Sequence, residues 1–233
     1  MRQDDAGLVA REYSTMERVA LRRLDRTARL SGELEWTVAL SAIAETRPDR
    51  VLDAGCGTGE FAALIPAPGL VCVDSSPPAV AAARAHGLDA KLAKIEELPF
   101  PDGEFDVVTW NWTLYHLPDR DRGITELARV LRPAGRFVGI YNFPDHLQEV
   151  WRATGVTWDA AGFDAEAGRA QLSAHFAKVR QEETHGEAVW DDPRSLQTYL
   201  DAYLELAGPL VAPRHPYPFR SQRHVCVFIA TRA

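Results

Sequence analysis

The chain has 233 residues, of which 46% are hydrophobic, 25% are charged and 9% are aromatic, and its formal net charge at pH 7 is −7. Such a composition supports a globular domain and excludes collagen, coiled-coil, secreted mini-protein and disordered classes. An acidic surface repels nucleic-acid backbones, and no apolar run reaches the roughly 18 residues that a membrane helix needs. Because the N-terminus does not resemble a signal peptide, we expect a cytoplasmic protein with neither nucleic-acid nor membrane partners.

Residues 8–46 combine apolar residues at helical spacing with many arginines. The spacing predicts one or two amphipathic helices. Acidic and apolar residues are interleaved with the arginines, which favours a solvated helix face over a patch for nucleic acid. These arginines are Arg18, Arg22, Arg23, Arg26 and Arg29.

Strand and helix signals alternate from residue 50 to residue 141. Ser76 is a candidate N-cap for a helix that begins at Pro77 and stops at Gly87. A second helix is predicted over 119–131. Because the apolar runs do not alternate with polar residues, the strands should pair in parallel with helices on both faces, as a doubly wound α/β sheet. The predicted strands are 50–53, 70–74, 90–94, 105–110 and 136–141.

The signals change beyond residue 143. Residues 144–172 are polar and aromatic without a strand pattern. Runs at 176–183 and 224–231 predict strands on either side of a helix at 193–206. The proline-rich segment 209–219 predicts a loop. No long polar linker separates these parts, so we expect a single domain.

The three cysteines and seven histidines show no pattern of ligands or bridges. Cys56, Cys72 and Cys226 are odd in number and lack a CxxC spacing, so we interpret them as small buried hydrophobic residues. The histidines do not fall at paired ligand spacing, and no metal site is predicted.

The strongest local signal is VLDAGCGTGEF at 51–61. A strand ends at Asp53, glycines occupy every second position from 55 to 59, and a helix is expected to begin there. Glycines let the backbone approach a ligand, and ligands of open α/β sheets bind beyond the carboxyl ends of the strands. The dinucleotide fingerprint would need a glycine where Glu60 stands, which argues against NAD or FAD. Asp74 ends the next strand, where a carboxylate can accept both hydroxyl protons of a ribose.

Together these segments resemble class I S-adenosylmethionine-dependent methyltransferases of the small-molecule type 11 group, which includes enzymes of ubiquinone and menaquinone biosynthesis. The resemblance rests on VLDAGCGTG (51–59), VCVDSSPPAVAAARA (71–85), ELPFPDGEFDVVTWNWTLYHLPD (97–119) and ELARVLRPAGRFVG (126–139). It implies a Rossmann-like, mostly parallel seven-stranded sheet with a C-terminal antiparallel hairpin. The implied parts of the single domain 1–233 are an N-terminal helical lid at 1–48, a cofactor-binding core at 49–143, and a substrate-side insertion with closing strands at 144–233.

The same resemblance implies contacts to S-adenosylmethionine. Gly55 and Gly57 approach its methionine part, with Cys56 between them. Asp53 shapes the loop or meets the amino group, and Asp74 takes the ribose hydroxyls. Where the family often has an acid beside the adenine, this chain has a lysine, so either the glutamate two residues later or a backbone carbonyl must accept from the adenine amino group. The remaining implied contacts are Ser75, Lys94, Ile95 and Glu96 at the adenine, and Asn111 and Trp112 at the methionine end.

The acceptor side is less sharply defined. A general base helps when the acceptor is a hydroxyl, by about 10²–10⁴-fold. The candidate is His116, which either serves as that base or only lines the pocket. The segment after the fourth strand lacks the proline pair of amino-nucleic-acid methyltransferases, which again counts against DNA or RNA. The candidate acceptor-binding residues are Tyr13, Trp112, Tyr115, His116, Tyr141 and His146.

The sequence therefore predicts metal-independent methyl transfer to a small molecule, such as a secondary metabolite, by in-line displacement. One alternative is a protein that binds the cofactor without transferring methyl, either in regulation or to assist a rearrangement with the sulfonium charge. A nicotinamide oxidoreductase is a more distant one. Both a monomer and a homodimer fit the sequence.

Overall fold

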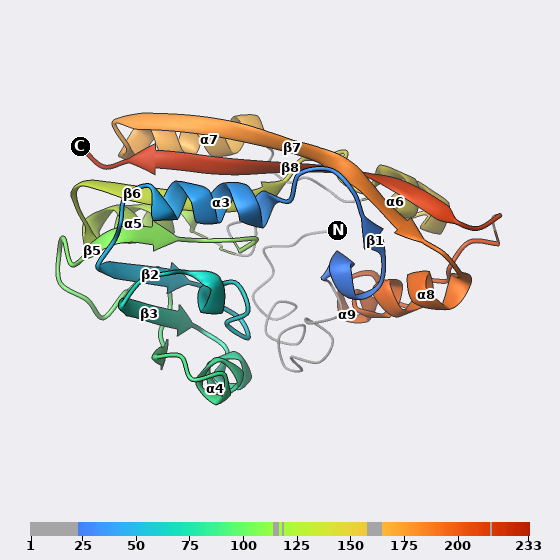
Figure 1. Ribbon diagram of the computed structural model, residues 1–233, viewed down its shortest axis with the longest axis horizontal. Coiled ribbons are helices and arrows are strands. Elements are labelled where there is room, and N and C mark those ends of the chain that lie inside the picture. The colour runs from blue at the N-terminus through green and yellow to red at the C-terminus, as the bar shows by residue number, and fades with distance from the viewer. Residues whose placement is uncertain (1–22, 114–116, 118, 158–164, 215) are drawn as a thin grey trace.

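The computed structural model describes residues 23–113, 117, 119–157, 165–214 and 216–233, through which one eight-stranded sheet runs (Figure 1). The strand order is β1-β7-β8-β6-β5-β2-β3-β4. The strands from β6 to β4 in this order pair in parallel, and β8, β7 and β1 continue the sheet in antiparallel pairs. The predicted doubly wound sheet with a C-terminal hairpin is thus confirmed. The strands are β1 (Arg29–Leu30), β2 (Arg50–Ala54), β3 (Gly69–Asp74), β4 (Ala90–Leu92), β5 (Phe105–Thr109), β6 (Leu131–Asn142), β7 (Lys178–Trp190) and β8 (Phe219–Thr231).

The sheet has one strand more than the seven predicted. β1 consists of Arg29 and Leu30, which lie opposite Val189 and Ala188 of β7. A strand of two residues has no periodicity that a sequence pattern could reveal. It pairs with the outer edge of β7 and so covers part of an otherwise open edge.

Helices cover both faces of the sheet. α3 lies on one face and packs against β6 and β8, whereas α5 and α7 contact each other on the opposite face (Figure 1). α4 packs against β3 and β4. The helices are α3 (Glu35–Ala44), α4 (Pro77–Ala85), α5 (Arg120–Val130), α6 (Gln148–Thr154), α7 (Ala165–His175), α8 (Pro193–Asp201) and α9 (Leu204–Ala207).

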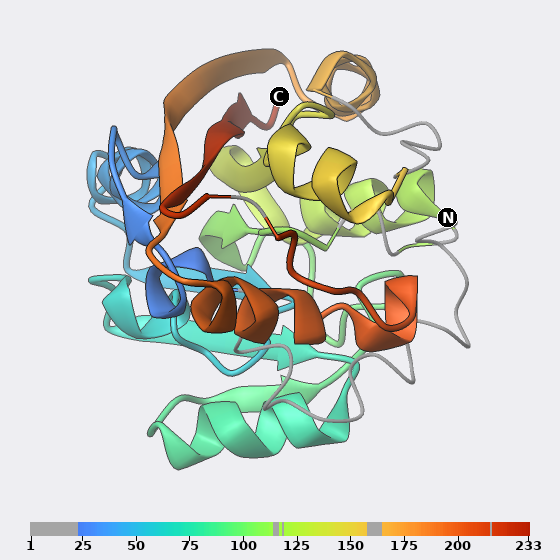
Figure 2. The ribbon, with the colours of Figure 1, turned by 90° about the vertical axis from the view of Figure 1, so that its right-hand side faces the viewer.

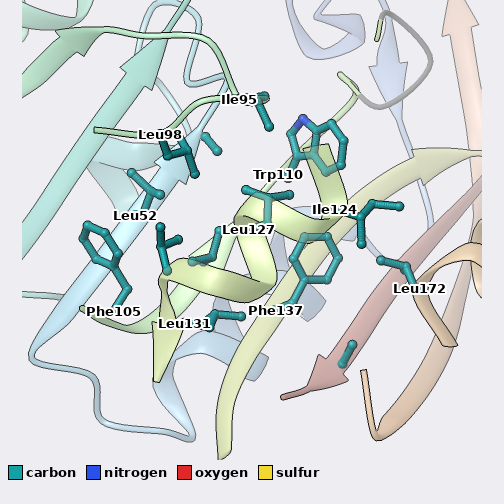
Figure 3. Close-up of a cluster of buried hydrophobic side chains, with 14 of the residues drawn as sticks. Leu52, Ile95, Leu98, Phe105, Trp110, Ile124, Leu127, Leu131, Phe137 and Leu172 are labelled. Atoms are coloured by element: carbon teal, nitrogen blue, oxygen red, sulfur yellow. The ribbon is translucent and has the colours of Figure 1, made fainter. Parts of the chain in front are cut away.

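An extensive apolar cluster fills the space between the sheet and α5 (Figure 3). Leu52, Phe105 and Phe137 come from three neighbouring strands, and Ile124 and Leu127 come from α5. All five side chains are fully buried. Because burial of one such side chain contributes about 1.5–3 kcal/mol, this cluster fixes the strands whose ends carry the loops described below.

Capping residues mark the starts of α4 and α5, and the predicted N-cap at Ser76 is confirmed. The hydroxyl of Ser76 accepts a hydrogen bond from the N–H of Ala79 at 3.4 Å, and α4 begins with Pro77. The carboxylate of Asp119 accepts one from the N–H of Arg122 at 3.0 Å at the start of α5. The predicted burial of the three cysteines is also confirmed, and their thiols are free.

The N-terminal prediction of amphipathic helices over 8–46 is only partly correct. Residues 8–22 lie outside the described residues. The described part contains a 3₁₀ turn (Leu24–Arg26), β1 and α3. α3 belongs to the domain core rather than to a lid, because it buries one side against the sheet through Val38, Ala39, Ala42 and Ile43.

The C-terminal elements are longer and more divided than predicted. β7 and β8 have 13 residues each and extend beyond the predicted strands toward the segment that joins them, which contains α8 and α9. Polar residues and Gly186 interrupt the apolar pattern of β7 beyond residue 183, although Thr184, Ala188, Val189 and Trp190 are buried there. The predicted helix over 193–206 is split into α8 and α9, and the segment 144–172 contains α6 and the start of α7.

The carboxyl ends of the parallel strands point to one end of the molecule, at the right of Figure 1 and toward the viewer in Figure 2. α6 and α8 lie at this end. Among the described residues, no helix has the length and apolar character to cross a membrane.

Candidate functional site

The glycine loop follows β2 at this end of the sheet and is fastened to β3. The backbone N–H groups of Gly55 and Cys56 both donate to the carbonyl oxygen of Val73, at 2.8 and 3.0 Å. Gly55, Gly57 and Gly59 have φ values of +75°, +55° and +83°. Side chains are strained at such angles, so the loop needs glycine at all three positions.

The regular helix expected after the loop does not form. The chain makes a turn and a single 3₁₀ helix at Ala62–Leu64 instead. Pro66 and Pro68 follow within four residues, and proline cannot continue a helix. Any ligand must therefore be held by the loop and by side chains rather than by the N-terminus of a long helix.

Asp74 lies at the end of β3, against the loop. Its carboxylate accepts hydrogen bonds from the N–H of Gly57 at 2.9 Å and from the N–H of Ser76 at 2.8 Å. Burial raises the pKa of this carboxyl, and hydrogen bonds from backbone N–H groups oppose the rise. Each carboxylate oxygen has a second lone pair, so Asp74 can hold the loop and still accept hydroxyl groups of a ligand.

Asp53 lies beneath the loop, on β2, and is almost completely buried. It faces Thr109 of β5, whose hydroxyl donates to the Asp53 carboxylate at 2.5 Å. Burial raises the pKa of Asp53 to about 7, the Thr109 hydroxyl lowers it, and the charge of Asp74 raises it. A carboxyl with such a pKa changes its charge near neutral pH, and shifts of this kind often mark functional sites.

Two buried polar groups without partners lie where β5 leads into the next loop. The side-chain carbonyl of Asn111 accepts the N–H of Ile140 at 3.1 Å, but its amide nitrogen has no partner. The hydroxyl of Thr113 also has no partner, and its oxygen is 3.1 Å from where a Cβ on Gly55 would be. Unsatisfied buried polar groups are rare. Thr113 lies against Gly55 of the glycine loop, and a polar ligand beside the end of β5 could satisfy both groups.

Comparisons with known proteins agree with this geometry. Residues 52–139 match the family model described as a methyltransferase domain. A demethylmenaquinone methyltransferase of Thermus thermophilus is 37% identical over 132 residues, which cover 52% of this chain and 60% of that protein. The 27-O-demethylrifamycin SV methyltransferase of Amycolatopsis mediterranei is 39% identical over 123 residues, which cover 48% of this chain and 43% of that protein.

The fold also matches a solved structure. A SAM-dependent methyltransferase of Thermotoga maritima superposes with a TM-score of 0.61 at 16% identity, over 96% of this chain and 99% of that one. Residues 52–139 therefore match a methyltransferase domain, and the chain has the fold of a SAM-dependent methyltransferase. The family and the cofactor predicted from the sequence are thereby confirmed. The matched segment spans about half of this chain and 43% to 60% of the two curated relatives.

The cofactor fits the residues of this methyltransferase domain. S-adenosylmethionine carries ribose hydroxyls, which suit Asp74, and an amino acid end, which suits the free amide of Asn111. At Gly57 an added Cβ would meet nothing within 4 Å, so the loop has an open side there. By contrast, Cys56 is buried and packs with Cys72 and Val80 below the loop, so it contributes its backbone rather than its thiol to the site.

Three of the four predicted adenine-side residues, Lys94, Ile95 and Glu96, follow β4. The N–H of Ala93 donates to the carbonyl of Asp74 at 3.0 Å, which places this segment beside the end of β3. Lys94 is exposed, and Ile95 is buried in the core cluster with Leu52. The carbonyl of Glu96 accepts from Arg122 at 3.0 Å. The fourth predicted adenine-side residue, Ser75, follows Asp74 at the end of β3 and is exposed.

The contacts around Trp112 were not predicted from the sequence. Its indole N–H donates to Asn142 at 3.0 Å, and its ring lies 6.4 Å from that of Trp36. The Arg23 guanidinium lies 4.5 Å from the centre of the Trp36 ring and pairs with Glu60 of the glycine loop at 2.7 Å. Arg26 also pairs with Glu60. Arg26 is exposed, as a solvated face predicts, but it lies in a 3₁₀ turn rather than in an amphipathic helix. No spacing in the sequence links either arginine to Glu60.

Two predicted acceptor-binding residues are core residues. Tyr141 is 1% exposed, and its hydroxyl donates to the carbonyl of Trp110 at 3.1 Å. His146 is buried, and its Nδ1 accepts the N–H of His224 at 3.2 Å. Burial lowers the pKa of His146 to about 4, so it is neutral at pH 7. The predictions for Tyr13, Tyr115 and His116 lie outside the described residues.

Proposed function

We propose that this protein is an S-adenosylmethionine-dependent methyltransferase that acts on a small molecule. The observation that carries the proposal is Asp74, which is buried at the end of β3 and hydrogen-bonded to the glycine loop. The free amide of Asn111 and the free hydroxyl of Thr113 on the other side of the loop support it. The named activities of the relatives, on demethylmenaquinone and on demethylrifamycin, favour a polycyclic or quinone-like acceptor.

The cofactor supplies a methyl group on a positively charged sulfur, which leaves with the electron pair of the carbon–sulfur bond when an acceptor atom attacks the methyl carbon. The residues of this chain hold the ribose and the methionine part of the cofactor in place. Asp74 accepts the ribose hydroxyls, and Asn111 donates to the carboxylate of the methionine part. Such positioning can supply about 7–11 kcal/mol of the barrier without a metal ion.

The acceptor lies, in this proposal, beside Trp112 and the neighbouring loop. Trp112 has the left-handed φ of +52° and is held by Asn142 and Trp36, so its ring is fixed in one orientation. A fixed aromatic ring suits a flat acceptor at low entropic cost. His116 is the proposed base for a hydroxyl acceptor, and Tyr13 and Tyr115 are proposed to line the pocket. If His116 is the base, His116→Ala lowers kcat by about 10²-fold or more with little change in cofactor affinity.

The cofactor half of the proposal is tested by calorimetric titration with S-adenosylmethionine, S-adenosylhomocysteine and NAD. We expect the first two to bind and NAD not to bind. Asp74→Ala removes charge-assisted hydrogen bonds, so cofactor affinity should fall about 10- to 100-fold. Ser76→Ala is the matched control, because it removes the cap of α4, leaves the Asp74 carboxylate in place and should change affinity less than about twofold. Equal affinities in the wild type and Asp74→Ala would refute the assignment.

The transfer itself is tested by product formation. Wild-type protein, S-adenosylmethionine and a panel of reduced quinones and polyketide phenols should give S-adenosylhomocysteine and a methylated acceptor. Cofactor binding without product for any acceptor in the panel would favour a binding protein that does not transfer methyl. Substitution of Trp112 by alanine should raise the KM for the acceptor more than the Kd for the cofactor, and the opposite pattern would contradict its place at the acceptor.

A further inference from the structure

Three side chains with metal-ligating atoms meet on the hairpin of β7 and β8. Glu183 and His185 are two residues apart on β7, so they point to the same face of the sheet. His224 lies on β8 directly opposite His185. One ligand atom from each of the three lies within 4.8 Å of the other two. We call these residues the hairpin triad.

The distances within the hairpin triad suit a metal ion. The Nε2 atoms of His224 and His185 lie 3.4 and 3.8 Å from the Oε2 atom of Glu183. Two ligands bound to zinc at about 2.1 Å in tetrahedral geometry are separated by about 3.4 Å. The rings of His185 and His224 stack with their centres 4.3 Å apart and their planes at 25°. The exposed His185 ring must therefore turn out of this stack before an ion can bind all three atoms.

His224 is held in place before any ion binds. Its Nδ1 atom lies 2.7 Å from the carboxylate of Asp145, which directs the opposite ring atom, Nε2, toward Glu183. Its ring also stacks on Phe143 with the ring centres 3.7 Å apart and the planes at 12°. Histidine ligands in metal sites commonly donate their second ring N–H to a carboxylate in this way, and the partner orients the ring.

We propose that Glu183, His185 and His224 bind a first-row divalent transition metal ion, for which zinc is the best-fitting species, with Asp145 as the carboxylate that orients His224. Two imidazoles and one carboxylate are nitrogen and oxygen ligands that suit zinc and its neighbours rather than calcium or magnesium. Three protein ligands leave the fourth position of a tetrahedral ion for water or another ligand.

This site is separate from the cofactor site. The strands β6 and β5 lie between β8 and the glycine loop after β2 in the strand order. Phe143, which stacks on His224, directly follows β6, so the triad lies at the same end of the sheet as the loop. The proposal therefore does not depend on methyl transfer.

The test is a titration of the full chain, free of any affinity tag and stripped of metal, with Zn²⁺ in competition with a chromophoric chelator. We expect one zinc ion per chain with a dissociation constant of about 1 µM or tighter. His185→Ala and Glu183→Gln should each weaken binding at least tenfold, and Asp145→Asn should weaken it by about tenfold through the orientation of His224. The two exposed β7 residues can be replaced without disturbing the core, which circular dichroism verifies.

His175→Gln is the matched control. His175 also pairs with an aspartate, Asp121 at 2.7 Å, and its side chain is 18% exposed, as that of His224 is. Among the described residues no third ligand joins that pair, so His175→Gln should leave zinc affinity unchanged. Zinc affinity that is unchanged in both His185→Ala and Glu183→Gln overturns the proposal, and so does the lack of saturable binding up to about 100 µM Zn²⁺.

Discussion

The sheet has two regions that bring side chains together in different ways: the parallel strands β2 and β3 with the glycine loop, called the cofactor side, and the antiparallel strands β7 and β8, called the hairpin side. Asp53 and Asp74 end the parallel strands β2 and β3, so their loops meet at one edge of the sheet. Glu183, His185 and His224 meet because β7 and β8 run antiparallel in one register. A short motif can encode the first arrangement. The second depends on pairing between segments that are far apart in the sequence, and spacing alone does not reveal it.

The two sides also differ in the interactions that stabilise them. The strands of the cofactor side are fixed by the apolar cluster under α5. On the hairpin side, Arg223 of β8 is only 1% exposed and pairs with Glu35 at the start of α3. Arg223 also donates to the carbonyl of Ser31 at 3.1 Å. A charged group therefore connects the hairpin to the N-terminal segment, and this connection can be removed with one substitution.

The largest expected effect follows from that ion pair. Glu35→Ala leaves the Arg223 guanidinium buried without its carboxylate, so the free energy of unfolding should fall by about 3–5 kcal/mol. Urea denaturation followed by circular dichroism measures the change. The double variant with leucine at both positions removes both charges and should recover most of the loss. If it does not, lost packing rather than an unpaired charge explains the effect.

Glu45→Ala on the same helix is the control. Its partner Arg136 lies at 2.9 Å, but the Glu45 side chain is 58% exposed. Exposed ion pairs contribute about 0–1 kcal/mol, so this variant should lose less than about 1 kcal/mol. A loss equal to that of Glu35→Ala would mean that burial does not distinguish the two pairs, and the comparison between the two sides would fail.

The same contrast explains which parts of the fold could be predicted. The strands from β2 to β5 and the capped helices α4 and α5 carry strong local signals, namely continuous apolar runs and N-cap residues, and their predicted bounds are nearly correct, whereas β6 begins at Leu131 rather than at the predicted Arg136. β1 was missed because two residues carry no pattern. The helix after the glycine loop was wrongly predicted because the effect of Pro66 and Pro68 outweighs the apolar residues that precede them.

The candidate site was also predictable only where a short motif encodes it. Asp53, Asp74 and the glycines follow from the strand–loop motif and its resemblance to a family. The burial of Tyr141 and His146 was not predicted, since their positions near the end of β6 do not tell which way their side chains point. Thr113 was missed because its only distinguishing property, a buried hydroxyl without a partner, exists only in three dimensions.

A smaller loss of stability is expected from alanine substitutions at two glycines of the glycine loop, Gly57 and Gly59. Gly57→Ala places a methyl group on the open side of the loop at a φ of +55°. The free energy of unfolding should fall by about 1–2 kcal/mol, because an L-residue is strained there. If the cofactor approaches this side, its affinity should fall at least about tenfold, which corresponds to about 1.4 kcal/mol. Calorimetric titration and urea denaturation measure the two quantities.

Gly59→Ala provides the comparison. Its Cβ would lie 2.2 Å from the side chain of Leu88 and 3.3 Å from that of Ala83, on the inner side of the loop. This variant should lose more stability than Gly57→Ala and, where it is folded, less cofactor affinity. Wild-type affinity in Gly57→Ala would contradict the proposed approach of the cofactor to the open side of the loop.

The last effect is gradual and concerns the pH dependence of stability on the cofactor side. The pKa of Asp53 is about 7 in the folded protein, against 3.8 for the unperturbed group. The folded state therefore holds more protons than the unfolded state between these values, and stability must fall as the pH rises from about 4 to about 7. One group can contribute a slope of up to about 1.4 kcal/mol per pH unit.

Asp53→Asn removes this titration while it keeps an oxygen that can accept from the Thr109 hydroxyl. The variant should match the wild type in stability near pH 4 and exceed it at pH 8, and the difference between their urea denaturation curves isolates Asp53 from all other groups. In Thr109→Val the hydrogen bond that lowers the Asp53 pKa is lost, so the fall in stability should extend to higher pH. A difference between the wild type and Asp53→Asn that does not vary with pH would mean that this carboxyl keeps its charge when buried. In that case the cofactor side, like the hairpin side with Arg223, would hold a permanent charge in its interior.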